Sequence, residues 1–214
     1  MVRNAPRRKA SRLGTPSNND SFRLRFTGMF YALVHYPNID IKLINEFRRK
    51  YDPNVALIDP HITFVFLVPE SVGEGNLISH IRSVLKHWQP FPIRLKGLQK
   101  AWDHLLFLIV ADGNENVNRL YCELYTGILA AYRRPDIEFV PHLGLGLFAR
   151  QDGNYDIRNP RDVSLDVEAY SHALKEARPL ELDYHCIIDR LLHLVKITDD
   201  ISRIVWSKEF LLSG

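Results

Sequence analysis

The chain has 214 residues, of which 46% are hydrophobic and 25% are charged, and its formal net charge is +3. A chain of this length and composition can bury a sizeable core without disulfides or metal ions, so we expect one soluble globular domain, or two small lobes that share a core. The longest apolar run, LLFLIVA at 105–111, is too short to span a membrane, and we expect neither membrane contact nor a secretory signal. Cys122 and Cys186 lie in apolar periodic segments outside any C-x-x-C motif, which predicts reduced thiols in an intracellular protein.

The N-terminal tail carries the excess positive charge. Residues 1–20 hold five basic residues and one acidic residue, a charge of +4, whereas the rest of the chain sums to −1. Low apolar content predicts a disordered basic tail over residues 1–24, followed by one domain over residues 25–214. The tail could contact nucleic-acid phosphates, direct the protein to the nucleus or an organelle, or have no specific role. Without such targeting we expect a cytoplasmic protein.

The first half of the domain is predicted to alternate strands and helices. Apolar and aromatic residues predict a strand over 26–36, and apolar residues at three-residue spacing predict a helix over 39–52. A second strand and an amphipathic helix follow at 60–68 and 73–88. Two further strands, 90–102 and 104–112, are predicted to form a hairpin that turns near Asp103.

The second half repeats this order. We expect a long helix over 116–134 that ends before Pro135, a strand over 139–149 and a helix over 164–177 with a serine or aspartate cap. Two strands follow, at 180–190 and 191–199, and the segment over 203–212 closes the chain.

Two segments support an internal repeat. RRKYDPNVALIDPHITF (48–64) and YRRPDIEFVPHLGL (132–145) each contain a helix end with paired arginines and then a strand entered by Pro-His. Downstream, ISHIRSVL (78–85) parallels YSHALKEA (170–177). Consecutive strands without a helical crossover predict an α+β fold with mainly antiparallel sheets. We expect two βαβαββ-like lobes, intertwined and related by a pseudo-twofold axis, with their sheets facing a central cleft.

The Pro-His strands place histidines on one face of each strand, because side chains alternate with period two. The predicted cleft-facing sets are His61, Thr63 and Val65 in the first strand, and His142, Gly144, Gly146 and Phe148 in the second. The opposite, buried sets are Ile62, Phe64 and Phe66, and Leu143, Leu145 and Leu147. The pseudo-twofold axis would bring His61 and His142 together across the cleft.

A pair of facing imidazoles suits phosphoryl chemistry. A neutral histidine takes a proton from the attacking water or hydroxyl, and a protonated histidine gives one to the leaving oxygen. The hydroxyl of Thr63, two residues after His61, can donate to a phosphate oxygen.

Paired H-x-T/S motifs on strands of two repeated lobes resemble the 2H phosphoesterase superfamily, which includes 2′-5′ RNA ligase-like proteins and cyclic nucleotide phosphodiesterases. The resemblance covers roughly residues 25–212 and depends on His61-Ile62-Thr63 and His142-Leu143-Gly144. It implies a bilobal fold and metal-independent action on 2′,3′-cyclic phosphates or 2′-5′ linkages of RNA or nucleotides. It also implies that His61 and His142 are catalytic and that Thr63 binds the phosphate.

Gly144 departs from the family pattern, which has a second Thr or Ser there. Loss of one preorganised donor costs about 10²–10³ in rate, so the alternative function is a weakened module that binds RNA or nucleotide without turnover. Gly144 could still act as a backbone donor to the phosphate, and Gly144 and Gly146 together could empty the cleft wall or mark a bulge.

Three further residues are weaker candidates. Arg150 could approach a phosphate or face solvent, and Tyr31 and Tyr184 could stack a base or pack in the core. No H-x-x-x-H or H-x-x-E-H motif and no phosphate-binding glycine loop is present. We therefore expect neither a metal nor a cofactor, and we expect a monomer whose partner is an RNA or nucleotide substrate.

Overall fold

The computed structural model describes residues 30–101, 104–150, 164–189, 192–197 and 204–212. The predicted tail over 1–24 and the turn at Asp103 lie outside these ranges. The first half contains β1 (Phe30–His35), α1 (Lys42–Tyr51), β2 (Ile62–Pro69), α2 (Glu74–Leu85), β3 (Phe91–Ala101) and β4 (Leu105–Asp112). The second half contains α3 (Asn114–Leu124), β5 (His142–Leu147), α4 (Val167–Ala177), β6 (Asp183–Ile188), β7 (Leu192–Ile197) and β8 (Ile204–Phe210).

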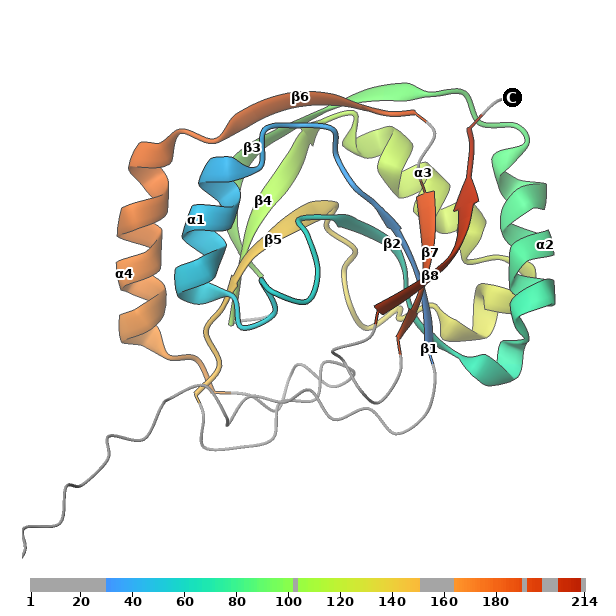
Figure 1. The fold of residues 1–214 in the computed structure, drawn as a ribbon, viewed down its shortest axis with the longest axis horizontal. Helices are drawn as coiled ribbons and strands as arrows, with labels where there is room; N and C mark the ends of the chain where they lie inside the picture. The colour runs from blue at the N-terminus through green and yellow to red at the C-terminus, as the bar shows by residue number, and fades with distance from the viewer. Residues whose placement is uncertain (1–29, 102–103, 151–163, 190–191, 198–203, 213–214) are drawn as a thin grey trace, which may run out of the picture.

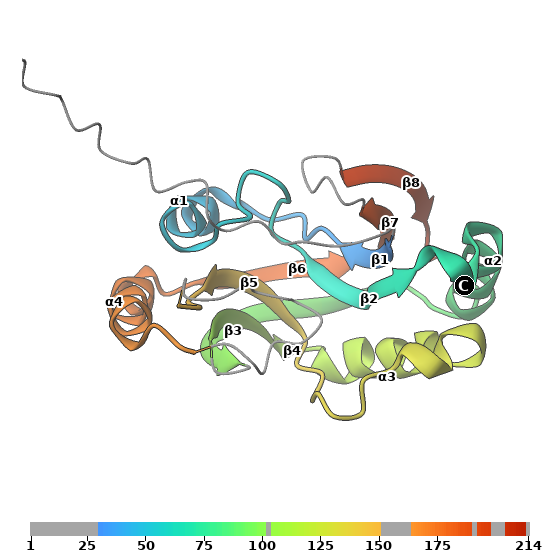
Figure 2. The ribbon, with the colours of Figure 1, turned by 90° about the horizontal axis from the view of Figure 1, so that it is seen from below.

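The strands form two four-stranded sheets, ordered β2-β1-β7-β8 and β5-β4-β3-β6. Every pairing between neighbours in these sheets is antiparallel, which confirms the predicted α+β class. Figures 1 and 2 show α1 and α4 at one end of the molecule and α2 and α3 at the other. The buried apolar side chains of both sheets and all four α-helices form one continuous cluster.

The two Pro-His strands occupy matching places. β2 is the edge strand beside β1, β5 is the edge strand beside β4, and β2 and β5 contact each other (Figures 1 and 2). The helix α1 packs against β5, whereas α3 packs against β2. Each Pro-His strand is therefore held by a helix from the other half of the chain.

Each of these strands carries a register shift at the same distance from its histidine. The β1–β2 pairing shifts between Thr63 and Val65, and the β4–β5 pairing shifts between Gly144 and Gly146. An extra residue in one strand of an antiparallel pair defines a β-bulge and breaks the two-residue alternation. The glycines of the second strand thus flank a bulge, one of the alternatives left open by the sequence.

The bulge in β2 corrects the predicted faces beyond Thr63. Ile62 and Phe64 are buried as expected, but Val65 is only 1% exposed and Phe66 is 36% exposed. The backbone N–H of Phe66 donates to the hydroxyl of Tyr125, at 2.9 Å. Burial raises the pKa of Tyr125 to about 12, partly opposed by that N–H, so the hydroxyl stays protonated while it accepts this bond.

We expect Tyr125→Phe to destabilise the protein by about 0.5–1.5 kcal/mol, because it removes the hydroxyl that accepts from the Phe66 N–H. Urea denaturation of the variant measures this free energy of unfolding. Tyr132→Phe, which changes a partly exposed tyrosine of the same segment, is the matched control. An equal and small effect for both variants would contradict the structural role of Tyr125.

The helix predicted over 116–134 is shorter in the structure, which corrects that prediction. The helix α3 ends at Leu124, and a 3₁₀-helix follows over Gly127–Tyr132. The φ of Gly127 is 51°, in the left-handed region that glycine tolerates and that interrupts a right-handed helix. His80 of α2 lies with Nε2 2.9 Å from the Leu124 carbonyl oxygen, which can only accept, so the ring donates and caps the end of α3.

The repeated Ser-His segments have structural roles. His80 joins α2 to the end of α3, and His172 of α4 lies with Nδ1 2.8 Å from the hydroxyl of Tyr51, the last residue of α1. Each histidine therefore connects the second helix of one half to the first helix of the other. These contacts explain the repeated pattern without a catalytic role.

Candidate active site

His61 and His142 stand at the same point of the two Pro-His strands and make the same backbone contact. The Nδ1 atom of His61 is 2.8 Å from the carbonyl oxygen of Asp59, and that of His142 is 2.5 Å from the carbonyl oxygen of Val140. A carbonyl oxygen can only accept, so Nδ1 carries the proton in each ring. In the neutral imidazole Nε2 is then the acceptor, which is the state that a general base requires.

Electrostatics link the two rings. Removal from water is the main cause that lowers the pKa of His142 to about 4; the positive charge of a protonated His61 contributes to this lowering, and the hydrogen bond to the Val140 carbonyl opposes it. Burial likewise lowers the pKa of His61, the hydrogen bond to the Asp59 carbonyl opposes this, and the charge of Arg48 adds to the lowering. Both histidines are therefore neutral at pH 7 in the free protein.

Aromatic side chains differ around the two histidines. The His142 ring stacks on the ring of Phe107 with a centroid distance of 3.4 Å and an interplanar angle of 12°. The His61 ring lies 6.0 Å from the ring of Tyr36, tilted by 55°. Sequence reasoning missed both aromatics, because each comes from the neighbouring strand or its end and belongs to no motif.

Thr63 and Gly144 follow their histidines by two residues, as predicted. The side chain of Thr63 is partly exposed. A Cβ atom built on Gly144 would meet no atom within 4 Å, so Gly144 faces open space. A Cβ atom on Gly146 would lie 2.8 Å from Cζ of Phe148 and 3.0 Å from Cβ of Tyr51. Gly146 therefore lets Phe148 and α1 approach β5, which corrects the idea that both glycines empty one wall.

The backbone of Gly144 is oriented away from the β4 ladder. His142 is opposite Ile109 and Gly144 is opposite Phe107, and the N–H of Val110 donates to the carbonyl of Pro141 at 2.9 Å. Hydrogen-bonded and non-hydrogen-bonded pairs alternate in an antiparallel ladder, so His142 and Gly144 occupy the non-bonded type. Their N–H groups point away from β4, at the edge of the sheet.

The weaker candidates differ in how far the structure buries them. Tyr31 is 2% exposed and belongs to the core, so its ring offers no face to a base. Arg150 is exposed, lies beyond the end of β5 and stays a prediction. Tyr184 of β6 is partly buried against the core and stays a prediction. We leave Tyr31 out of the proposed site.

Within the ranges that the structure describes, no group of three or more His, Cys, Asp or Glu side chains could hold a metal ion. Among the same residues, no helix is both long and apolar enough to cross a lipid bilayer.

The lowered pKa of His142 predicts a pH-dependent stability. The unfolded chain binds a proton at His142 below its ordinary pKa of 6.5, whereas the folded chain does so only near pH 4. The free energy of unfolding should therefore fall as the pH drops from 6.5 to 4, by about 1–2 kcal/mol after allowance for the partial exposure of the ring.

Chemical denaturation across this pH range measures the effect. His142→Phe should flatten the pH dependence, while His185→Phe, at an exposed position of β6, should leave it unchanged. Equal slopes for the parent protein and His142→Phe would contradict the lowered pKa.

The sequence of the chain matches the model of a known protein family. The model of the 2′-5′ RNA ligase superfamily matches residues 36–180, about two thirds of the chain, and spans both Pro-His strands. The chain belongs to the 2′-5′ RNA ligase superfamily. The prediction of a 2H phosphoesterase-like protein is thereby confirmed.

Relatives of this superfamily member include bacterial proteins named as candidate phosphoesterases. One from Bacillus licheniformis is 28% identical over 134 residues, which cover 60% of this chain and 77% of the relative. One from Geobacillus thermodenitrificans is 29% identical over 124 residues, which cover 55% of this chain and 69% of the relative. With the family match, these relatives support a phosphoric diester hydrolase as the class of enzyme.

Solved structures of similar fold support the architecture of this superfamily member. A Thermus thermophilus protein matches with a TM-score of 0.53 at 19% identity, covering 88% of this chain and 99% of the other. Escherichia coli LigT complexed with 3′-AMP matches with a TM-score of 0.50 at 17% identity, covering 87% and 98%. At these identities the likeness concerns the fold alone.

Proposed function

We propose that the protein is a phosphodiesterase that hydrolyses 2′,3′-cyclic phosphates or 2′-5′ linkages of RNA or nucleotides without a metal ion. The observation that carries the proposal is the matched pair His61 and His142. His61 directly precedes β2 and His142 is the first residue of β5, and these two edge strands contact each other. Each Nδ1 atom contacts the carbonyl oxygen two residues earlier. Both histidines thus present an unprotonated Nε2 when neutral.

The proposed reaction on a cyclic phosphate divides proton transfer between the two rings. The neutral histidine takes a proton from water through Nε2, and the water oxygen forms a bond to phosphorus. The bond from phosphorus to one ribose oxygen breaks, and the protonated histidine donates its Nε2 proton to that oxygen. The product is a phosphomonoester with one free ribose hydroxyl.

The negative charge of the substrate favours protonation of one of the two histidines. Both rings are neutral in the free protein at pH 7, because their pKa values are lowered. A phosphate anion between them favours the imidazolium form and raises these pKa values. We therefore expect binding of an anionic substrate to be accompanied by uptake of a proton.

Two groups are proposed to hold the phosphate oxygens. Thr63 donates through its hydroxyl, and Gly144 donates through its backbone N–H, which points away from β4. The complex of Escherichia coli LigT with 3′-AMP supports a nucleotide as the ligand class for this chain also. Tyr184 stays a candidate for contact with the base.

Hydrolysis of a 2′,3′-cyclic nucleotide in the presence of EDTA tests the proposal. We expect turnover that EDTA leaves unchanged and that yields a single phosphomonoester. A screen of 2′-5′-linked dinucleotides under the same conditions defines which substrate class is preferred. Absence of turnover on both classes, or its loss in EDTA with recovery on addition of a divalent metal ion, would contradict the proposal.

A binding module without turnover is the second candidate, and Gly144 favours it because the second hydroxyl donor of the family pattern is absent. Isothermal titration with a nucleoside 2′-monophosphate separates the candidates. Binding without hydrolysis of any cyclic or 2′-5′ substrate would support the module. Deletion of residues 1–20 should reduce the salt dependence of RNA binding if the basic tail contacts phosphates.

A further inference from the structure

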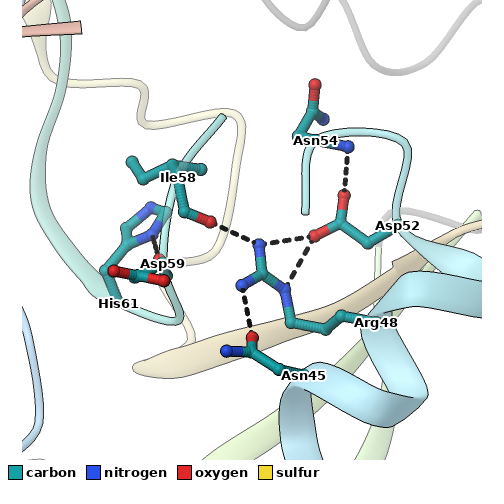
Figure 3. A network of polar contacts seen from close by, with 7 residues as sticks. All are labelled: Asn45, Arg48, Asp52, Asn54, Ile58, Asp59 and His61. Atoms are coloured by element: carbon teal, nitrogen blue, oxygen red, sulfur yellow. Dashed lines mark hydrogen bonds and ion pairs between the residues drawn. The ribbon is translucent and has the colours of Figure 1, made fainter. Parts of the chain in front are cut away.

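A buried arginine stands behind His61. Arg48 lies on α1, and only 2% of its surface is exposed. Its Nη2 is 2.7 Å from Oδ2 of Asp52 and its Nε is 2.8 Å from the same oxygen, while Nη1 donates to Oδ1 of Asn45 at 3.3 Å (Figure 3). The guanidinium is thus surrounded by acceptors on several sides.

Arg48 also holds the loop that leads to His61. Its Nη2 donates to the carbonyl of Ile58 at 2.8 Å, and the next residue, Asp59, accepts the bond from Nδ1 of His61 (Figure 3). Asp52 uses its other oxygen, Oδ1, to accept from the N–H of Asn54 at 2.8 Å. One arginine therefore connects the end of α1, the turn after it and the backbone beside the histidine.

The corresponding arginine in the second half of the chain bonds a different partner. Arg134, in the paired arginines of the repeat, is exposed and bonds Asp136 two residues later. His142 is instead stacked on Phe107. His61 thus has a charged, hydrogen-bonded support, and His142 has an aromatic one.

A buried ion pair is a weak source of stability, since the cost of removing two charges from water offsets their attraction. An apolar side chain on α1 would fill the position of Arg48 without that cost. The directional bonds to Ile58 and Asp52 therefore indicate a role in geometry.

We propose that Arg48 is a positioning residue for His61: it fixes the 52–60 loop so that the Asp59 carbonyl holds the His61 proton on Nδ1 and leaves Nε2 for the reaction. The inference depends on the proposed function for the use of His61 in catalysis. The tautomer of His61 does not depend on turnover and can be measured separately.

The charged groups around His61 shift its pKa in opposite directions, so the role of Arg48 can be measured. The positive charge of Arg48 lowers the pKa of His61, and the negative charges of Asp52 and Asp59 raise it. Tyr36 and His142 are the other titratable groups near the ring. Removal of the Arg48 charge should raise the pKa of His61, and removal of the Asp52 charge should lower it.

The experiment follows the imidazole ¹⁵N and ¹³C resonances of His61 by NMR against pH, assigned through His61→Gln. We expect Arg48→Met to raise the pKa of His61 and Asp52→Asn to lower it. Arg48→Lys keeps the charge but not the fork of donors, so it should leave the pKa nearly unchanged and shift the neutral ring away from the Nδ1–H tautomer. Arg49→Lys, at the exposed next position of α1, should change neither quantity.

Turnover then reports the consequence for the reaction. Misplacement of a reacting group by a fraction of an ångström to 1 Å costs up to about 10² in rate, so Arg48→Lys should lower kcat by about 10–100-fold with little change in KM. If Arg48→Met does not fold, Arg48→Lys and Asp52→Asn still decide the question. An unchanged His61 tautomer in Arg48→Lys, or a pKa shift of the wrong sign in Asp52→Asn, would overturn the inference. If Arg48→Lys shifts the His61 tautomer as expected but the parent protein shows no turnover, the proposed function is rejected and the positioning role of Arg48 stands.

Discussion

Replacement of His61 or His142 by alanine is expected to lower kcat for a 2′,3′-cyclic nucleotide by about 10²–10⁴-fold. Each substitution removes one of the two groups that move a proton in the proposed transition state. Single-turnover measurements on the folded variants give this rate for the bond-breaking step. KM should change less, because Thr63 and the backbone of β5 remain to hold the phosphate.

A double variant tests whether the two histidines act together, and two exposed histidines serve as controls. Because the two rings act on one transition state, His61→Ala combined with His142→Ala should lose little more than either single variant. His87→Ala and His185→Ala, at exposed positions, should keep the parent rate. The parent enzyme should show a bell-shaped pH profile, and each single variant should lose one limb. A bell-shaped pH profile that persists in both single variants would show that His61 and His142 do not carry out the proton transfers.

Gly144→Thr and Gly146→Thr are expected to have opposite consequences. A Cβ atom at Gly144 enters open space, so threonine there should fit and supply the second hydroxyl donor of the family pattern. We expect kcat to rise by about 10–100-fold, somewhat less than the 10²–10³ of a fully preorganised donor. Stability should change by less than about 1 kcal/mol, with threonine favoured in a strand.

Threonine at Gly146 is the matched contrast in the same strand. Its Cβ would lie within 3.0 Å of both Phe148 and Tyr51, so the α1–β5 contact must move. We expect a loss of about 1–3 kcal/mol in the free energy of unfolding, measured by denaturant titration. Equal tolerance at both positions would refute the assignment of Gly144 to an open site and Gly146 to a packing contact. An unchanged or lower kcat in a stable Gly144→Thr variant would favour the binding module.

The two histidine strands could be predicted from the sequence because Pro-His followed by alternating apolar residues occurs twice, in matching contexts. The alternation of side chains along each strand then predicted which residues follow His61 and His142 on the same face, as far as Thr63 and Gly144. It failed at Phe66, since the bulge after Thr63 depends on how β1 pairs with β2. The helix over 116–134 failed for a similar reason, because its end at Leu124 is set by Gly127 and by a contact from His80.

The residues that hold the two histidines in place could not be predicted from the local sequence pattern. Phe107 reads as one apolar residue in a buried strand, and only the pairing of β4 with β5 brings its ring to His142. Arg48 reads as one member of a charged helix face, yet the structure buries it against the loop before His61. For Tyr31 the sequence left base stacking and core packing open, and the structure buries the ring in the core.

One NMR titration tests most directly whether His61 and His142 share a phosphate site. A nucleoside 2′-monophosphate is added at pH 7, and the Nε2 resonances of both histidines are followed in the same sample. We expect both resonances to shift along one binding curve with one Kd, and both pKa values to rise in the bound state. A shift at only one histidine, or two curves with different Kd values, would contradict a shared site and with it the proposed two-histidine mechanism.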